Sequence, residues 1–110
     1  VEGEHPAKYL NSSYAKSRYL AGIEHIQGES AVMVEGIVDV YALRAAGVSN
    51  VLALGGATIS SYQLDLLRAK YIKHITLALD NDTVGQEATE RIGALLLKEG
   101  FKVSTAAIQG

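Results

Sequence analysis

From Glu29 onward, short apolar runs alternate with segments whose apolar residues recur at helical spacing. This alternation is typical of βαβ units, in which each helix returns the chain so that the next strand lies parallel to the last. The apolar runs are almost continuous, as expected for strands that are covered on both faces. The expected strands are 31–34, 51–54, 74–79 and a run that begins at Val103. The sequence therefore predicts an α/β protein with a four-stranded parallel sheet flanked by helices, a Rossmann-like arrangement.

The segments between these runs predict three helices with recognisable ends. Gly47 stands where a left-handed C-terminal cap of the first helix would lie, and Thr58 or Ser60 would cap the start of the second. The third helix is expected to close before Gly100. The first helix is indicated by Ile37, Val40 and Leu43, which repeat at helical spacing, and the third by Ala88, Ile92, Leu95 and Leu96. In the second helix we expect a buried stripe of Leu64, Leu67 and Tyr71.

Residues 1–28 differ from this core. Loop-like residues come first, and Tyr19, Ile23 and Ile26 then follow at helical spacing, so we expect an irregular arm and one helix before a core at 29–110. A chain of 110 residues that is 48% hydrophobic and 20% charged can bury one core, which predicts a single domain. A strand-like run stops just before Gln109, and we interpret the chain as a piece of a longer protein.

Composition excludes several classes of function. Ten Lys and Arg residues against 12 Asp and Glu residues give a net charge of -2, so no overall attraction to nucleic acid is expected. The chain has no cysteine, which excludes disulfides and thiol nucleophiles and suits a reducing cytoplasm. His5, His25 and His74 lack the spacing of a zinc site. No apolar run approaches the ~20 residues that span a bilayer, so we expect a soluble, cytoplasmic protein without a membrane partner.

Acidic residues follow two of the predicted strands. Glu35 closes the first strand, Asp80 closes the third, and Asp82 comes two residues later. In an open parallel sheet, ligands bind beyond the carboxyl ends of the strands, where the chain order reverses. For four strands we favour the order 2-1-3-4, which makes the first and third strands neighbours at that point. These three carboxylates are therefore expected to converge.

Converging carboxylates repel one another unless a cation lies between them. A hard divalent ion with oxygen ligands relieves that repulsion, and magnesium is the natural occupant, with manganese as an ion that accepts similar ligands. Asp39 lies one helical turn after Glu35 and faces the same rim, where it could help bind a second ion. The sequence therefore predicts a magnesium site on Glu35, Asp80 and Asp82, with Asp39 nearby.

Each of these residues also has an ordinary structural interpretation. Asp80 or Asp82 could cap the helix that begins near Thr83, and a strand often ends in a polar residue and a glycine. A calcium-binding EF-hand loop does not fit the segment that starts at Asp80, because Val84 and Arg91 stand at two ligand positions. The same segment is similar to the nucleophile motif of haloacid-dehalogenase-type phosphatases, although that motif belongs on a first strand. This phosphatase remains an alternative.

Residues 35–39 resemble the glutamate motif of bacterial DNA primases of the DnaG type, and 80–85 resemble their paired-aspartate motif. The turn at 54–58 and the arm segments 8–12 and 16–18 are also similar to this family, so the resemblance covers nearly the whole chain. It implies a TOPRIM fold and a contribution to nucleotidyl transfer in RNA primer synthesis during DNA replication. TOPRIM nucleases and topoisomerases remain an alternative, but their paired-aspartate segment usually continues into further acidic residues.

The resemblance also implies roles for individual residues and for partners. Glu35, Asp80 and Asp82 would be catalytic, Glu35, Asp39, Asp80 and Asp82 would bind Mg²⁺, and Lys8, Lys16 and Arg18 would contact nucleotide phosphates or the template. The ordinary interpretation of the three basic residues is solvated surface charge. DNA template and nucleoside triphosphates would be the partners of the full-length primase, and a replicative helicase would bind regions outside this chain, within the primosome.

A complete primase of this family also has a zinc-binding domain, a basic N-terminal polymerase part and a further acidic motif. We therefore expect the 110 residues alone to be inactive in primer synthesis. A non-catalytic binding module with the same fold is the remaining alternative, and it would show no metal-dependent effect.

Overall fold

Four parallel strands form the sheet, in the order β2-β1-β3-β4. The computed structural model describes residues 19–56, 58–80 and 82–106. Within these ranges the elements are η1 (Ile23–His25), β1 (Ser30–Val34), α3 (Ile37–Ala45), β2 (Val51–Ala53), α4 (Ser61–Ala69), β3 (His74–Leu77), α5 (Thr83–Lys98) and β4 (Lys102–Thr105). The predicted fold class and strand order are confirmed. No helix in these ranges is long and apolar enough to cross a membrane.

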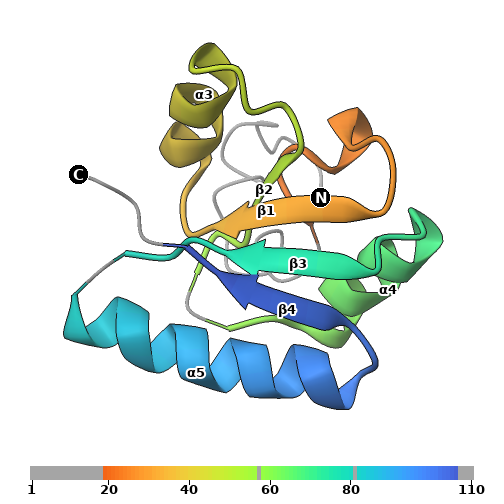
Figure 1. Cartoon of the computed structure of the whole chain (residues 1–110), viewed down its shortest axis with the longest axis vertical. Helices are drawn as coiled ribbons and strands as arrows, with labels where there is room; N and C mark the ends of the chain where they lie inside the picture. Colours follow the sequence, from red (N-terminus) through yellow and green to blue (C-terminus); the bar gives the residue numbers. More distant parts are fainter. Residues whose placement is uncertain (1–18, 57, 81, 107–110) are drawn as a thin grey trace, which may run out of the picture.

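The helices cover the two faces of the sheet unequally. Figure 1 shows α3 on one face and α4 and α5 on the other. The larger apolar cluster includes Leu67 of α4 and Ile92 of α5, whereas the smaller one joins Val40 of α3 to β2 and to the end of β1. Right-handed crossovers explain this division, because the chain moves from β1 to one edge and then from β2 back past β1 to β3 and β4.

The helix ends follow local capping chemistry. Gly47 has a φ of 97°, and the Gly47 and Val48 N–H groups donate to the last carbonyls of α3 in a Schellman motif, as the sequence predicts. Ser60, not Thr58, caps α4 in a capping box. The prediction that Tyr71 is buried is wrong, because α4 ends at Ala69 and Tyr71 adopts a left-handed turn with 76% of its surface exposed.

The helix expected around Tyr19 to Ile26 is also wrong. Only three residues, Ile23–His25, form a 3-10 turn, and Ala21 instead makes an antiparallel bridge with Ala53. Gly22 makes this possible, because its φ of 92° belongs to the left-handed region that other residues avoid. Ile23 and Ile26 are buried in the larger apolar cluster, whereas Tyr19 has 38% of its surface exposed. The predicted arm at 1–18 lies outside the described residues.

Alanine at Gly22 and alanine at Gly28 should lower the free energy of unfolding by different amounts. Gly28 has a φ of 84° and open space around it, so Gly28→Ala should cost only the left-handed conformation, about 1–3 kcal/mol. A Cβ on Gly22 would stand 2.4 Å from the Val51 carbonyl oxygen. Because that backbone belongs to β2, Gly22→Ala should cost about 1–3 kcal/mol more than Gly28→Ala. Urea unfolding of both variants measures the difference, and equal losses would contradict the tight approach.

Candidate metal centre

Glu35 and Asp80 lie at the carboxyl ends of the two central strands. Met33 of β1 pairs with Leu77 of β3, and the Ala78 N–H continues this pairing by donating to the Met33 carbonyl at 2.9 Å. Both strands point the same way, so the residues that follow them leave the same edge of the sheet. From this edge α3 starts on one face and α5 on the other (Figure 1). This edge is the switch point at which open α/β sheets bind ligands.

Glu35 is half-buried, and the negative charges of neighbouring aspartates act on its carboxylate. Its Oε1 atom is buried and has no hydrogen-bond partner among the described residues. Burial raises the pKa of this carboxyl, the negative charges of Asp80 and Asp82 raise it further, and the Asp80 backbone N–H opposes them by hydrogen bonding. A side-chain hydrogen bond with Asp80 also raises the pKa. Glu35 and Asp80 therefore form a close carboxylate pair.

Asp82 lies at the start of α5 and serves as its N-cap. Its Oδ1 accepts a hydrogen bond from the Gly85 N–H at 2.7 Å. The capping alternative from the sequence therefore holds for Asp82, not for Asp80. Its charge still acts on Glu35, which places it near the pair. Asp82 can cap the helix through one oxygen and still contribute negative charge at this edge.

Asp39 lies in the first turn of α3 and turns back toward the start of its helix. Its Oδ2 is 3.9 Å from the place where a Cβ on Gly36 would stand. Within the described residues, however, no group of three or more His, Asp or Glu side chains is arranged to hold a metal. The structure thus brings Glu35 and Asp80 together, with Asp82 and Asp39 on the same edge, and shows no preformed three-carboxylate cluster.

A pair of carboxylates suits Mg²⁺ better than a site in which the protein supplies every ligand. Mg²⁺ usually keeps several waters and is bound through one or two carboxylates together with substrate phosphates. The unpartnered Oε1 of Glu35 is the observation that favours a cation here, because a buried carboxylate oxygen normally has a partner. Glu35 and Asp80 are therefore the residues best placed to hold the ion.

Gly85 is a site residue for which the sequence analysis assigned no structural role. A Cβ on Gly85 would stand 1.8 Å from the Asp80 carbonyl oxygen, so the first turn of α5 packs directly on the backbone of Asp80. The signal was a glycine inside the first turn of a helix, a position where glycine is otherwise unfavourable. Gly85 thereby fixes the path of the chain between the two aspartates.

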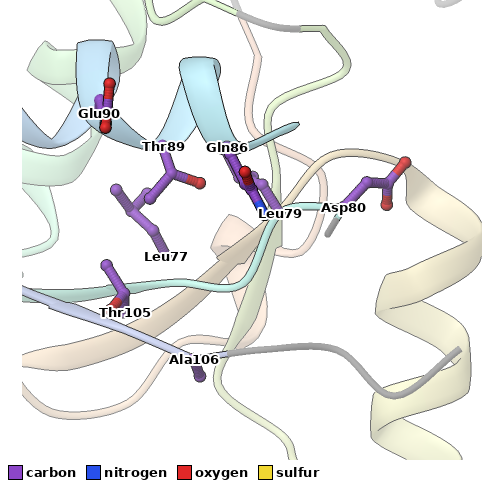
Figure 2. A pocket seen from close by; sticks show the side chains of 8 residues that line it. All are labelled: Leu77, Leu79, Asp80, Gln86, Thr89, Glu90, Thr105 and Ala106. Atoms are coloured by element: carbon purple, nitrogen blue, oxygen red, sulfur yellow. The ribbon is translucent and has the colours of Figure 1, made fainter. Parts of the chain in front are cut away.

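A pocket of about 380 Å³ opens between α5 and the end of β4. Its walls include Gln86, Thr89 and Glu90 of α5, Thr105 of β4, and Asp80. Figure 2 shows Asp80 apart from the other lining side chains, with its carboxylate pointing away from them. The described lining residues include two acids and no base, so this pocket does not suit a phosphate. Lys8, Lys16 and Arg18 lie outside the described residues.

A family model described as Toprim-like matches residues 32–110, which include Glu35, Asp80 and Asp82. This chain belongs to the Toprim-like family. As a Toprim-like domain it shares its fold with the Aquifex aeolicus primase (zinc-binding and RNA polymerase domains), with a TM-score of 0.72 and 32% identity over 84% of this chain and 24% of that one. The resemblance to a DnaG-type primase domain is confirmed.

Relatives of this Toprim-like domain differ in length. It is 35% identical to a DNA primase of Legionella pneumophila, over 83% of this chain and 17% of the primase. It is 32% identical to an uncharacterized protein, the MG010 homolog of Mycoplasma pneumoniae, over 92% of this chain and 49% of that protein. A putative protein from Aquifex aeolicus matches with a TM-score of 0.59 and 30% identity, over 76% of this chain and 78% of that one. The chain spans about half or less of the length of the Legionella pneumophila primase and of the Mycoplasma pneumoniae protein.

The repulsion between Glu35 and Asp80 predicts that the free energy of unfolding depends on pH. Folding raises the pKa of Glu35, so its carboxyl group favours the folded state when it is protonated. This contribution to the free energy of unfolding is fully present below the unfolded pKa and is lost as pH rises through the folded pKa. Glu35→Gln cannot ionise, so it should be more stable than the parent near neutral pH, and the gap should close below about pH 4. Urea midpoints across this range measure the gap. Glu87→Gln, at an exposed position of α5, is the control and should show no such trend. A parent more stable than Glu35→Gln at neutral pH would contradict the repulsion.

Alanine substitutions at two glycines of α5, Gly85 and Gly93, should affect the stability of the fold differently. Gly85→Ala should destabilise by more than about 2 kcal/mol, because the new Cβ meets the backbone of Asp80. A Cβ on Gly93 would meet Leu77 Cδ1 at 3.5 Å, an ordinary contact. Gly93→Ala should therefore be neutral or gain up to about 1 kcal/mol from helix propensity. Thermal unfolding of both variants tests this, and a harmless Gly85→Ala would show that the close approach is not required.

Proposed function

We propose that this chain is the TOPRIM domain of a DNA primase and supplies the carboxylates that bind Mg²⁺ for nucleotidyl transfer in RNA primer synthesis. One observation carries the proposal: the buried, unpartnered Oε1 of Glu35 lies beside Asp80 at the switch point of the sheet. A buried carboxylate oxygen without a hydrogen-bond partner costs stability, and so does a second carboxylate beside it. Such unfavourable arrangements cluster at functional sites. The similarity to DNA primases over most of this chain supports the same function.

Each acidic residue has its own part in this site. Glu35 and Asp80 bind the ion directly, Asp82 adds charge while it caps α5, and Asp39 lies near enough to the start of α3 to assist a second ion. A bound Mg²⁺ would neutralise the charge that develops on the transferred phosphoryl group. Manganese can replace it, because it accepts the same oxygen ligands.

Contacts to nucleic acid require local positive charge, because the chain as a whole carries a net charge of -2. We assign phosphate contacts to Lys8, Lys16 and Arg18, the basic residues of the arm that resembles primase. In the parent protein the partners are the DNA template, nucleoside triphosphates and a replicative helicase, which binds through other regions. The parent works in the cytoplasm, where primers are made in bacteria.

A second candidate function is a metal-dependent nuclease of the same fold. The putative Aquifex aeolicus protein keeps this candidate open, because this chain covers 78% of its solved chain, which is thus little larger than the domain that a nuclease of this fold would use. A nuclease would use the same carboxylate pair but would cleave nucleic acid without nucleoside triphosphates. Incubating the 110-residue chain with single-stranded DNA and Mn²⁺ tests it, and cleavage that Glu35→Gln abolishes would favour the nuclease.

Metal-induced stabilisation tests the primase-type site. At an ion concentration ten times the Kd, the parent should gain roughly 1.4 kcal/mol, and Glu35→Gln and Asp80→Asn should lose most of this gain. Asp82→Asn keeps the shape of the cap and should lose less. Melting temperatures with Mg²⁺ and Mn²⁺ measure the gain, with Glu87→Gln as the control. If Glu35→Gln responded to both ions as the parent does, the proposed ligand role would be wrong.

A further inference from the structure

Tyr71 closes α4 in a backbone conformation that tyrosine rarely adopts. Its φ of 59° lies in the left-handed region, and among the described residues no other non-glycine has a positive φ. The N–H groups of Tyr71 and of the next residue donate to the carbonyls of Arg68 and Leu67, each at 3.0 Å, in a Schellman motif. Two other helices end in the same motif with glycine at this position, Gly47 after α3 and Gly100 after α5. Tyr71 therefore carries a conformational cost that glycine would not.

Packing of the Tyr71 side chain does not offset this cost. The residue is 76% exposed, so its ring gains little from burial. Strained backbone conformations of this kind cluster at functional sites. A flat, rigid ring that is open to solvent can stack on another flat group. The ring is thus available to a partner, and the charges around it indicate which kind.

Positive charges surround Tyr71 at the amino ends of β3 and β4. The Lys102 N–H donates to the Lys73 carbonyl at 2.8 Å, which joins the two strand starts. Arg68 reaches the same place from α4, because its guanidinium lies over the Phe101 ring, 5.5 Å from the ring centroid. In Figure 1 this part of the sheet lies at the tails of the β3 and β4 arrows, opposite the arrowheads. We call the cations here the basic edge: Arg68, Lys70, Lys73, Lys98 and Lys102.

Carboxylates balance only part of the basic edge. Arg68 pairs with Glu99 at 2.7 Å, and the pair lies at the surface. Lys73 and Glu29 are 3.8 Å apart, and both side chains are well exposed to solvent. Exposed pairs of this kind are weak and leave their cations able to exchange partners. The cations that form no ion pair within the described part of the chain are Lys70, Lys98 and Lys102.

Helix dipoles explain only part of this positive charge. Arg68 and Lys98 lie in the last turns of α4 and α5, where cations are favourable. Lys73 directly precedes β3 and Lys102 begins β4, and strands have only small dipoles. The carboxylates of the metal centre lie at the other edge of the sheet, so the net charge of -2 conceals an acidic edge and a basic one. The basic edge therefore suits a polyanion that the acidic edge would repel.

We propose that the basic edge and Tyr71 bind single-stranded nucleic acid, with the lysines on its phosphates and the Tyr71 ring stacked on a base. Proteins that bind single strands without reading their sequence combine positive charge with exposed aromatic side chains. Phosphates and a base together match both features, whereas an acidic peptide matches the cations alone. This contact goes beyond the proposed function and does not depend on the metal centre.

Tyr71→Gly separates the conformational cost from the binding role. It should raise the melting temperature by about 4 °C or more, because glycine adopts the left-handed conformation freely. It should also weaken the binding of a short fluorescein-labelled single-stranded DNA by about fivefold or more, since the stacking ring is lost. Tyr71→Phe keeps the ring and should bind as the parent does. A lower melting temperature for Tyr71→Gly, or an affinity equal to the parent's, would overturn the inference.

The salt dependence of the same binding tests the cations. Lys70→Gln, Lys73→Gln and Lys102→Gln should each weaken binding and reduce the slope of log K against log salt by about 0.7 for each lost contact. Tyr71→Gly removes no charge and should keep the parent's slope. Arg44→Gln is the matched control, because it removes one cation from the last turn of α3, on the other face of the sheet, and should change neither quantity. If Arg44→Gln acted as strongly as the lysine variants, binding would depend on net charge alone and the inference would be wrong.

Omitting divalent ions separates this contact from the metal centre. Under these conditions Glu35→Gln should bind the DNA with the parent's salt slope. If the parent does not bind the DNA, or if no variant at the basic edge changes its affinity, the inference is wrong and the metal centre stands. A failure of Mg²⁺ and Mn²⁺ to stabilise the parent would instead contradict the metal centre, and DNA binding that depends on Tyr71 would still support the contact.

Discussion

The parallel pairing of β1 with β3 is the constraint on which the site depends. Because these strands are neighbours in the middle of the sheet, their carboxyl ends meet and the crossovers leave in opposite directions. α3 and α5 therefore start on opposite faces beside one edge, with Glu35 ahead of the first helix and Asp80 ahead of the second. A strand order that did not place β1 beside β3 would separate the two carboxylates.

The surrounding structure holds this unfavourable pair in place. The backbone of Asp80 is packed against Gly85, and Asp82 is tied to the same turn of α5 by its cap. A cation bound between the carboxylates would relieve their repulsion. Preorganised metal binding requires ligands that the surrounding structure holds in position, even where their mutual repulsion lowers the stability of the fold. The Toprim-like fold thus supplies position, and a bound cation would supply the balancing charge.

Sequence patterns predicted the sheet well because apolar runs, helical spacing and right-handed crossovers leave few arrangements open. They failed where the same spacing of apolar residues fits both a helix and an irregular segment. Tyr19 to Ile26 were expected to form a helix, but Gly22 turns the chain. The capping of α5 by Asp82 stayed open, since a cap and a ligand use the same residue type. Gly85 was missed as a positioning residue because its role depends on a close approach to the Asp80 backbone around a tight turn, which the spacing of residues does not reveal.

The most direct test of the account is the position of a bound ion in solution. Mn²⁺ is paramagnetic and broadens the NMR signals of nearby amides, so substoichiometric Mn²⁺ reports where it binds. A metal centre on the carboxylate pair predicts that broadening is strongest at Glu35, Gly36 and Asp80, and that Glu35→Gln removes it. Broadening centred on Glu90 and Thr105, which line the pocket beside α5, or broadening that persists unchanged in Glu35→Gln, would contradict a metal centre on the carboxylate pair.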